Sequence, residues 1–129
     1  QLGMALILIT HNLGIVARHA TRVLVMYAGK IVETGEARHI YQDHKHPYTL
    51  GLLNSVPRLN SAAGSKLTPI EGLPPNLIDL PGGCSFAPRC NYSTHQCITE
   101  TPPLTLINGQ SSSACWRWRE LPELASQCR

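Results

Sequence analysis

The chain opens on an apolar run without polar alternation, Met4–Ile9. A strand buried on both faces has this pattern, which is typical of a parallel sheet covered by helices on both sides. Before it, residues 1–3 predict the last turn of a helix with Gly3 as its C-terminal cap. We therefore expect the chain to begin inside an α/β domain. The run is far shorter than the roughly 20 residues that cross a bilayer.

The residues after this run predict a helix and a hairpin. Asn12 is a good N-cap for a short helix through His19. Two strands follow, over residues 21–27 and 30–34, joined by Ala28-Gly29. Because a type I′ turn prefers Asn at its first position, Ala28 favours a type I turn with Gly29 in a left-handed bulge. Gly35 is expected to end the hairpin.

The middle of the chain predicts two more helices and then loops. Residues 36–41 form a short helix, and Pro47 at a first helical position begins another, which Pro57 stops near Val56. Residues 58–68 have linker composition, and little regular structure is expected from Pro69 on. The predicted fold is thus α/β: a strand, a helix and a β-hairpin, followed by a helix and an irregular cysteine-rich extension.

Composition agrees with this division. The chain has 129 residues and is 43% hydrophobic, which fits one domain with a core. Nine of its ten prolines lie from Pro57 onward, so loops concentrate in the back half. The formal net charge is +3, and the basic residues are scattered rather than clustered, which argues against a nucleic-acid partner. No signal peptide is visible, because the start lacks a basic n-region followed by an apolar h-region.

His11 lies at the end of the first predicted strand and is a candidate for phosphate chemistry. Ligands of open α/β sheets bind outside the carboxyl ends of the strands. An imidazole there can donate a hydrogen bond to an oxygen that gains charge during phosphoryl transfer. Taken alone, a surface histidine that only terminates a strand is the more common case.

The surroundings of His11 resemble the end of an ABC-transporter ATPase domain. The resemblance is carried by residues 9–11, the short helix, and residues 22–35 with their "GKIVETG" stretch. It implies that His11 is the switch histidine, a catalytic and nucleotide-binding residue that contacts the γ-phosphate of ATP. Many family members have Asp after this histidine. Asn12 stands there instead, so one negative charge is missing beside the site while the N-cap is kept.

The chain lacks the ATPase motifs that precede this histidine in the family. It has no G-x-x-x-x-G-K-[ST] phosphate loop, and no acidic strand end to hold Mg²⁺ or polarise water. ATP with Mg²⁺ is therefore expected only in a full-length parent, a transport ATPase, and this chain alone is expected to be inactive. We assign residues 1–42 to the end of an ATPase domain, and 43–129 to an extension that is cysteine-rich from Cys84.

Two segments of the extension narrow the resemblance. Both resemble the C-terminal extension of ATPase subunits in dipeptide, oligopeptide and nickel importers. The first is His46–Thr49 ("HPYT") with the following residues 52–57, and the second is residues 80–90. The resemblance implies a peripheral protein on the cytoplasmic face of the cell membrane that powers import of di- or oligopeptides. Its implied partners are transmembrane permease subunits, a second ATPase subunit and, indirectly, a peptide-binding protein.

Five cysteines lie in the back half, an odd number that argues against a fully paired disulfide framework. Four of them are separated by five, six and seventeen residues: Cys84, Cys90, Cys97 and Cys115. Structural zinc sites usually contain closer pairs. From the residues alone, an iron–sulfur cluster, zinc and reduced thiols all stay open.

The importer resemblance implies a [4Fe-4S] cluster on these four cysteines, with zinc less favoured. Residues 69–129 have little apolar periodicity and need a staple, so we expect a structural rather than a redox role. Cys128, near the chain end, is expected to take no part. Trp116 and Trp118 flank Cys115 and are candidates to shield one side of the cluster.

An alternative from another functional class is a stand-alone, non-catalytic metal-binding module for protein interaction or electron transfer. The ATPase-like strands argue against it. The sequence upstream of Gln1 would separate the two hypotheses, because a phosphate loop there belongs only to the ATPase.

Overall fold

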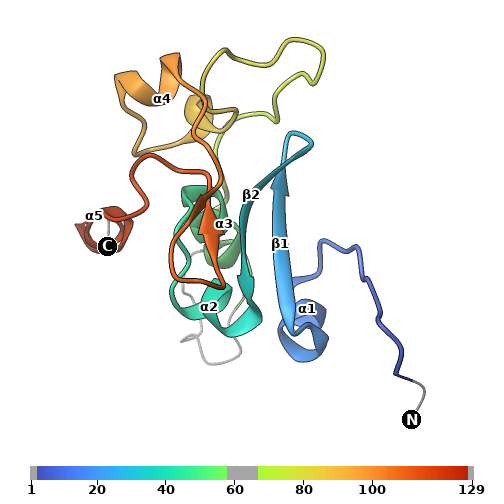
Figure 1. The fold of residues 1–129 in the computed structure, drawn as a ribbon. Coiled ribbons are helices and arrows are strands. Elements are labelled where there is room, and N and C mark those ends of the chain that lie inside the picture. The colour runs from blue at the N-terminus through green and yellow to red at the C-terminus, as the bar shows by residue number, and fades with distance from the viewer. Residues whose placement is uncertain (1–2, 58–66, 128–129) are drawn as a thin grey trace.

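The computed structural model describes residues 3–57 and 67–127 (Figure 1). Its first half contains α1 (Leu13–His19), β1 (Arg22–Tyr27), β2 (Lys30–Glu36), α2 (Ala37–Gln42) and α3 (Pro47–Asn54). Its second half contains the 3₁₀ helix η1 (Ala87–Arg89), α4 (His95–Thr99), β3 (Thr105–Leu106), β4 (Ser112–Ser113) and α5 (Leu121–Gln127). Among the described residues, no helix is long and apolar enough to cross a membrane.

The strands form one antiparallel sheet in the order β1-β2-β4-β3. β4 comes from the end of the chain and pairs with β2, Glu33 opposite Ser113. The backbone N–H of Ala114 extends this pairing by donating to the Val32 carbonyl at 2.8 Å. The back half therefore completes the sheet that the hairpin begins (Figure 1).

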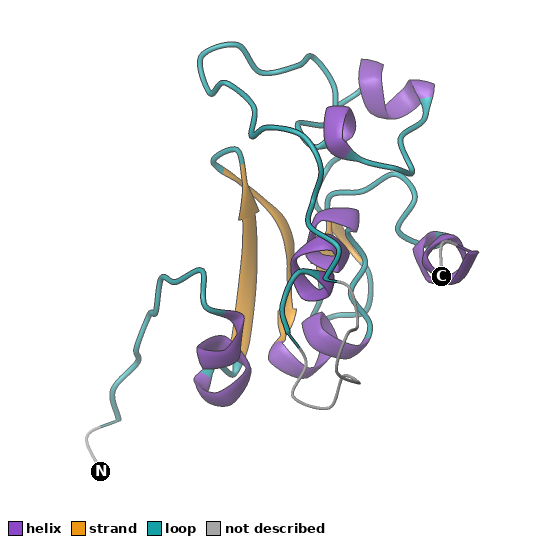
Figure 2. Cartoon of the chain, turned by 180° about the vertical axis from the view of Figure 1, so that it is seen from behind, coloured by secondary structure: helices purple, strands orange, loops and turns teal. Residues whose placement is uncertain are grey.

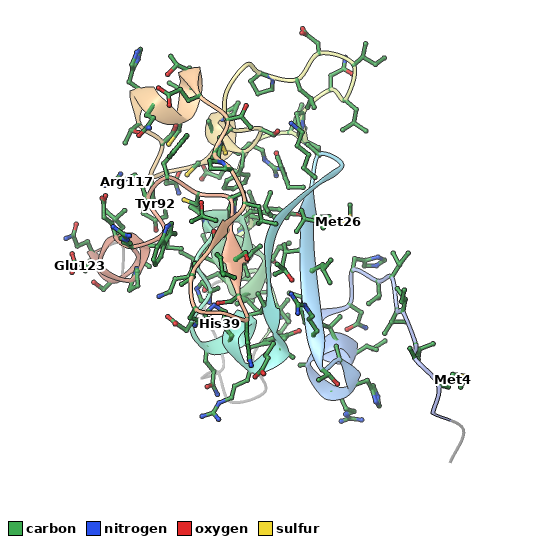
Figure 3. All side chains as sticks on the ribbon, in the orientation of Figure 1. Met4, Met26, His39, Tyr92, Arg117 and Glu123 are labelled. Carbon is green, nitrogen blue, oxygen red and sulfur yellow. The ribbon has the colours of Figure 1, made fainter. Side chains whose placement is uncertain are left out.

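The prediction of a buried strand at Met4–Ile9 is wrong for this chain. The segment is extended but unpaired, and its large side chains are 50–94% exposed. Figure 3 shows it leading away from the rest of the molecule toward Met4. An all-apolar strand is stable only between neighbouring strands and under covering helices, and none of the described elements takes those places. The predicted helix end at residues 1–3 falls largely on residues 1–2, outside the described residues.

The predicted helix after this segment is confirmed. Asn12 Oδ1 accepts hydrogen bonds from the backbone N–H groups of Gly14 and Ile15, as an N-cap side chain should. The hydroxyl of Tyr41 in α2 donates to the Leu13 carbonyl, which ties α1 to α2. α1 thus packs at the base of the hairpin.

The hairpin is confirmed, but its turn differs from the prediction. Tyr27 pairs with Lys30, so the loop has two residues. Ala28 has φ +50° and Gly29 φ +76°, and positive φ at both central positions defines a type I′ turn. Its twist matches the flanking strands, and this outweighs the strain of a left-handed alanine. β2 also runs on past Gly35 to Glu36.

The core lies on one face of the hairpin. Side chains alternate along β1, so that Val25 and Tyr27 are buried while Leu24 and Met26 are 54% and 57% exposed. The buried side is completed by residues from β2, α2 and the extension: Val32, Ile40 and Phe86. Met26 points outward from β1 (Figure 3), so the hairpin's other face is apolar but uncovered.

The remaining helices agree with the sequence in part. α2 and α3 lie within two residues of the predicted spans, and Pro47 occupies the first turn of α3. Most of the predicted linker, 58–66, lies outside the described residues. As expected, loops dominate from Pro69 on (Figure 2), yet the short pieces β3, β4, α4 and α5 were not predicted. Two- to seven-residue elements are held by tertiary contacts and leave little periodic signal.

Candidate metal centre

Four cysteines from separate turns of the extension line one cavity. Cys84 precedes η1, Cys90 caps its C-terminus, Cys97 is in α4, and Cys115 follows β4. We call this space the cysteine cavity. Its other walls are mostly apolar or aromatic, and include His46, Phe86, Trp116, Arg117 and Leu121. The structure brings these four cysteines to one cavity although they are up to 31 residues apart in the chain, and their role as metal ligands stays a prediction.

Backbone contacts fix the loops that carry the thiols. The N–H of Cys84 donates to the carbonyl of Cys97 at 2.8 Å. This approach requires a glycine at position 83, because a Cβ there would lie 2.3 Å from the same carbonyl oxygen. Cys115 is placed by β4, whose last bond joins Ala114 to Val32 of β2. Backbone hydrogen bonds thus help to place three of the four cysteines.

The thiols are close enough to influence one another. Each of the six pairs among them interacts electrostatically, so that one thiolate raises the pKa of the next. Burial raises the pKa of Cys84 and raises those of Cys90 and Cys115 to about 11 and about 12. These three are neutral, unreactive thiols at physiological pH. They become thiolates when a cation replaces their protons.

Hydrogen-bond donors nevertheless face the sulfurs. Backbone N–H groups two or three residues further on act on three of them and lower the thiol pKa: Phe86 and Ala87 on Cys84, Tyr92 on Cys90, and Arg117 on Cys115. The fourth, Cys97, has the Thr94 hydroxyl 3.4 Å from its sulfur. Donors directed at sulfur stabilise thiolate over thiol. The loops are therefore arranged for negative sulfur, although burial opposes it.

The charged neighbour of this site is Arg117. Its guanidinium donates to the Tyr92 carbonyl at 3.0 Å and pairs with Glu120, and its charge lowers the pKa of Cys90. Figure 3 shows Arg117 and Tyr92 side by side above α5. Trp116 lines the cavity and donates to the Glu100 carbonyl, while its role as a shield for a cluster stays a prediction. Trp118 is absent from the lining and instead lies under Arg119.

All four cysteines are free thiols. Within residues 3–57 and 67–127, no three or more His, Cys, Asp or Glu side chains are arranged to hold a single metal ion. Tetrahedral zinc needs four ligand atoms about 2.3 Å from one point. The thiols ring a cavity of about 20 Å³ instead. The fifth cysteine, Cys128, lies outside the described residues.

His11 is separate from this site. It is exposed, it follows the unpaired segment, and it does not line the cysteine cavity. The backbone beside it is ordered by local bonds, in which Asn12 N–H donates to the Thr10 hydroxyl and Asn12 caps α1.

Two buried residues were missed by the sequence analysis, and one of them lines the cavity. His46, the N-cap of α3, is 1% exposed and lines the cavity. Glu33 in β2 is fully buried, and its Oε1 accepts from the backbone N–H of Lys45. Burial raises the pKa of Glu33 to about 7, although hydrogen bonds and the Lys45 charge lower it. Because Glu33 alternates with ordinary strand residues, no pattern marked it as buried.

Comparison with known proteins assigns the family. Residues 32–97, about half of the chain, match the model of the oligopeptide/dipeptide transporter C-terminal region. The chain belongs to this family. It is 48% identical to the oligopeptide transport ATP-binding protein OppD of Mycobacterium tuberculosis over 89% of its residues, which are 19% of that protein. With OppD of Salmonella typhimurium it shares 46% identity over 91% of this chain and 34% of that protein.

The match covers only part of each relative's length. A relative from Brucella ovis, 48% identical, is covered over 37% of its length, and OppD of Haemophilus influenzae over 35%. The chain therefore spans between 19% and 37% of the length of these curated relatives. The prediction that the chain belongs to the family of peptide-importer ATPase extensions is confirmed.

Proposed function

We propose that this chain is the C-terminal part of an ATP-binding subunit that powers ATP-dependent import of di- or oligopeptides. The observation that carries the proposal is the family match over residues 32–97, together with 46–48% identity to OppD proteins. In this proposal residues 1–42 end the ATPase domain and 43–129 form the extension. The complete subunit binds ATP with Mg²⁺ on the cytoplasmic face of the membrane. It acts with permease subunits, a second ATPase subunit and a peptide-binding protein.

The uncovered face of the hairpin supports a larger parent domain. Leu24 and Met26 on β1, and the whole of Met4–Ile9, expose apolar side chains that monomeric proteins normally bury. β1 is also an open sheet edge in this chain. We infer that further strands of the complete ATPase domain pair with Met4–Ile9 and cover this face. His11 would then stand at the carboxyl end of a buried strand and meet the γ-phosphate.

The four thiols suit a [4Fe-4S] cluster better than a single metal ion. A cluster takes one thiolate on each iron, so its ligands ring a volume, as Cys84, Cys90, Cys97 and Cys115 do around their cavity. The N–H donors at the sulfurs and the Arg117 charge balance the anionic thiolates. The space of about 20 Å³ is small, so the loops must part as the group enters. The bound cluster would supply a structural crosslink.

The experiment uses the complete subunit, assembled with its permease and binding protein in vesicles. Peptide uptake should require ATP, and His11→Ala should reduce uptake and ATP turnover at least about 100-fold while nucleotide binding stays near normal, because the imidazole acts as charge develops. His19→Ala, on the exposed end of α1, is the matched control. Normal uptake in His11→Ala would remove the assigned role of His11. An absence of any ATP-driven uptake would favour the non-catalytic metal-binding module.

A further inference from the structure

The imidazole of His46 is held in one orientation. Its Nδ1 accepts a hydrogen bond from the backbone N–H of Tyr48 at 3.0 Å, and so caps the N-terminus of α3. A ring nitrogen that accepts carries no proton, so the proton of the neutral ring is on Nε2. Burial lowers the pKa of His46 to about 4, which keeps the ring neutral at physiological pH. His46 therefore presents one fixed N–H donor.

This donor has no hydrogen-bond partner among the described residues. Nε2 is buried and makes no hydrogen bond of normal geometry, although the backbone of Ala114 is close enough to act on the ring as an acceptor and raises its pKa, against the larger lowering by burial. A buried N–H without an acceptor costs about 1–3 kcal/mol. The ring is 1% exposed and lines the cysteine cavity. An acceptor inside the cavity would satisfy this donor better than the poorly placed Ala114 backbone does.

The chemistry of the cavity supplies such an acceptor when the thiols are charged. Thiolates and the sulfides of a cluster accept hydrogen bonds, and donors that surround them stabilise the anionic site. The N–H groups of Phe86, Tyr92 and Arg117 already face the sulfurs of Cys84, Cys90 and Cys115. His46 adds a donor from a different part of the chain, before α3.

We propose that His46 is a positioning residue of the cysteine site, whose Nε2–H donates to the sulfur of the anionic group that the four thiolates hold. This inference rests on the proposed cluster. It ties the site to α3 through Nδ1 and to β2 through the neighbouring N–H of Lys45, which binds Glu33. The segment "HPYT" is then part of the metal centre's surroundings and not only a helix start.

A capping role alone and a donor role make different predictions for His46→Asn. Asparagine is a good N-cap, so its side-chain oxygen can still accept from Tyr48 N–H, but its shorter side chain cannot place a donor where Nε2 is. Tyr48→Phe is the matched control. Its ring belongs to the same aromatic cluster, 5.4 Å from Phe86, and it does not line the cavity.

The test uses the complete subunit purified without oxygen, with iron and sulfide analysis, a redox titration and the rate of iron loss to a chelator. In His46→Asn the reduction potential should become more negative and iron should leave about 10-fold faster or more, the usual range for an outer-shell partner. Tyr48→Phe should match wild type in both. Wild-type potential and loss rate in His46→Asn would overturn the role of His46 and leave the cluster standing.

Two further outcomes keep the proposal falsifiable. A wild-type subunit without iron and sulfide refutes the cluster and, with it, the role of His46. If His46→Asn does not fold, pulsed electron paramagnetic resonance of the reduced wild-type protein, labelled with ¹⁵N-histidine, decides. A coupling from a histidine nitrogen to the cluster supports the donor, and the absence of any such coupling overturns it.

Discussion

Replacement of Glu33 by Gln tests the buried carboxyl that joins β2 to the start of α3. Glu33 is fully buried, and burial raises its pKa from 4.5 to about 7. A raised pKa means that the folded state binds the proton more tightly than the unfolded state. Between pH 4.5 and 7 the folded chain therefore holds more protons, and the free energy of unfolding falls as the pH rises.

The size of this effect follows from the shift. A change from 4.5 to about 7 corresponds to about 3 kcal/mol, since one pKa unit is about 1.4 kcal/mol. This penalty is absent below pH 4.5 and complete above pH 7. Glu33→Gln keeps an oxygen that can accept from Lys45 N–H and cannot ionise. Its amide N–H replaces Oε2, which is buried next to the donors Thr49 and His46 N–H and makes no hydrogen bond of normal geometry, so the substitution adds a cost of about 1–3 kcal/mol at every pH.

The assay is urea unfolding of the purified chain, followed by the fluorescence of Trp116 and Trp118, from pH 4.5 to pH 8. The stability of Glu33→Gln relative to wild type should rise by about 3 kcal/mol across this range, while the constant offset cancels. Comparison with wild type also removes the contribution of His46, whose lowered pKa acts with the opposite sign. Glu36→Gln, exposed at the end of the same strand, controls for the lost charge. Parallel pH profiles for Glu33→Gln and wild type would refute the reasoning.

Three further results are expected. Gly83→Ala should destabilise the extension by about 1–3 kcal/mol and release iron from the loaded subunit, because its Cβ would meet the Cys97 carbonyl. Gly82→Ala, with open space around it, should do neither. Equal melting temperatures for the two variants would contradict this. Replacement by serine of any one of Cys84, Cys90, Cys97 and Cys115 should abolish the iron and sulfide content, while Cys128→Ser should keep both. Metal lost only in Cys128→Ser would overturn the ligand set. The fragment 1–56 should aggregate rather than melt cooperatively in calorimetry, because it lacks β4 and Phe86 as well as cover for β1, and a soluble monomer with a cooperative transition would argue against this.

Local signals in the sequence predicted those parts of the fold that local physics decides. Asn12 as a cap, the strand patterns of residues 21–27 and 30–34, and Pro47 at a helix start each act within a few residues, and each element is found within two residues of its predicted bounds. The turn at Ala28 shows the limit of this approach. Its sequence favours one turn, but the twist of the paired strands selects another.

Non-local partners account for what sequence patterns missed. β4 has two serines and no β-propensity, and it is a strand because β2 offers it an edge. The strand prediction for Met4–Ile9 is wrong for the opposite reason. Its pattern is strongly strand-like, but none of the described strands lies beside it to pair with it. The four cysteines could be grouped by their resemblance to a family, whereas His46 and Glu33 look ordinary until the chain brings them against the cavity and α3.

The cysteine site and the hairpin share one strand, and this determines what a bound group would stabilise. Cys115 follows β4 directly, and β4 is held to the hairpin by Ala114 N–H to the Val32 carbonyl. The Ser113 hydroxyl donates to the Lys45 carbonyl at 2.8 Å, next to the N–H that binds Glu33. A group that binds only the folded site stabilises the folded state, and with it every contact that the site requires. Those contacts include β2, so a metal group bound by the four thiols would also stabilise the β1–β2 hairpin, and this stabilisation would by itself give the site a structural role.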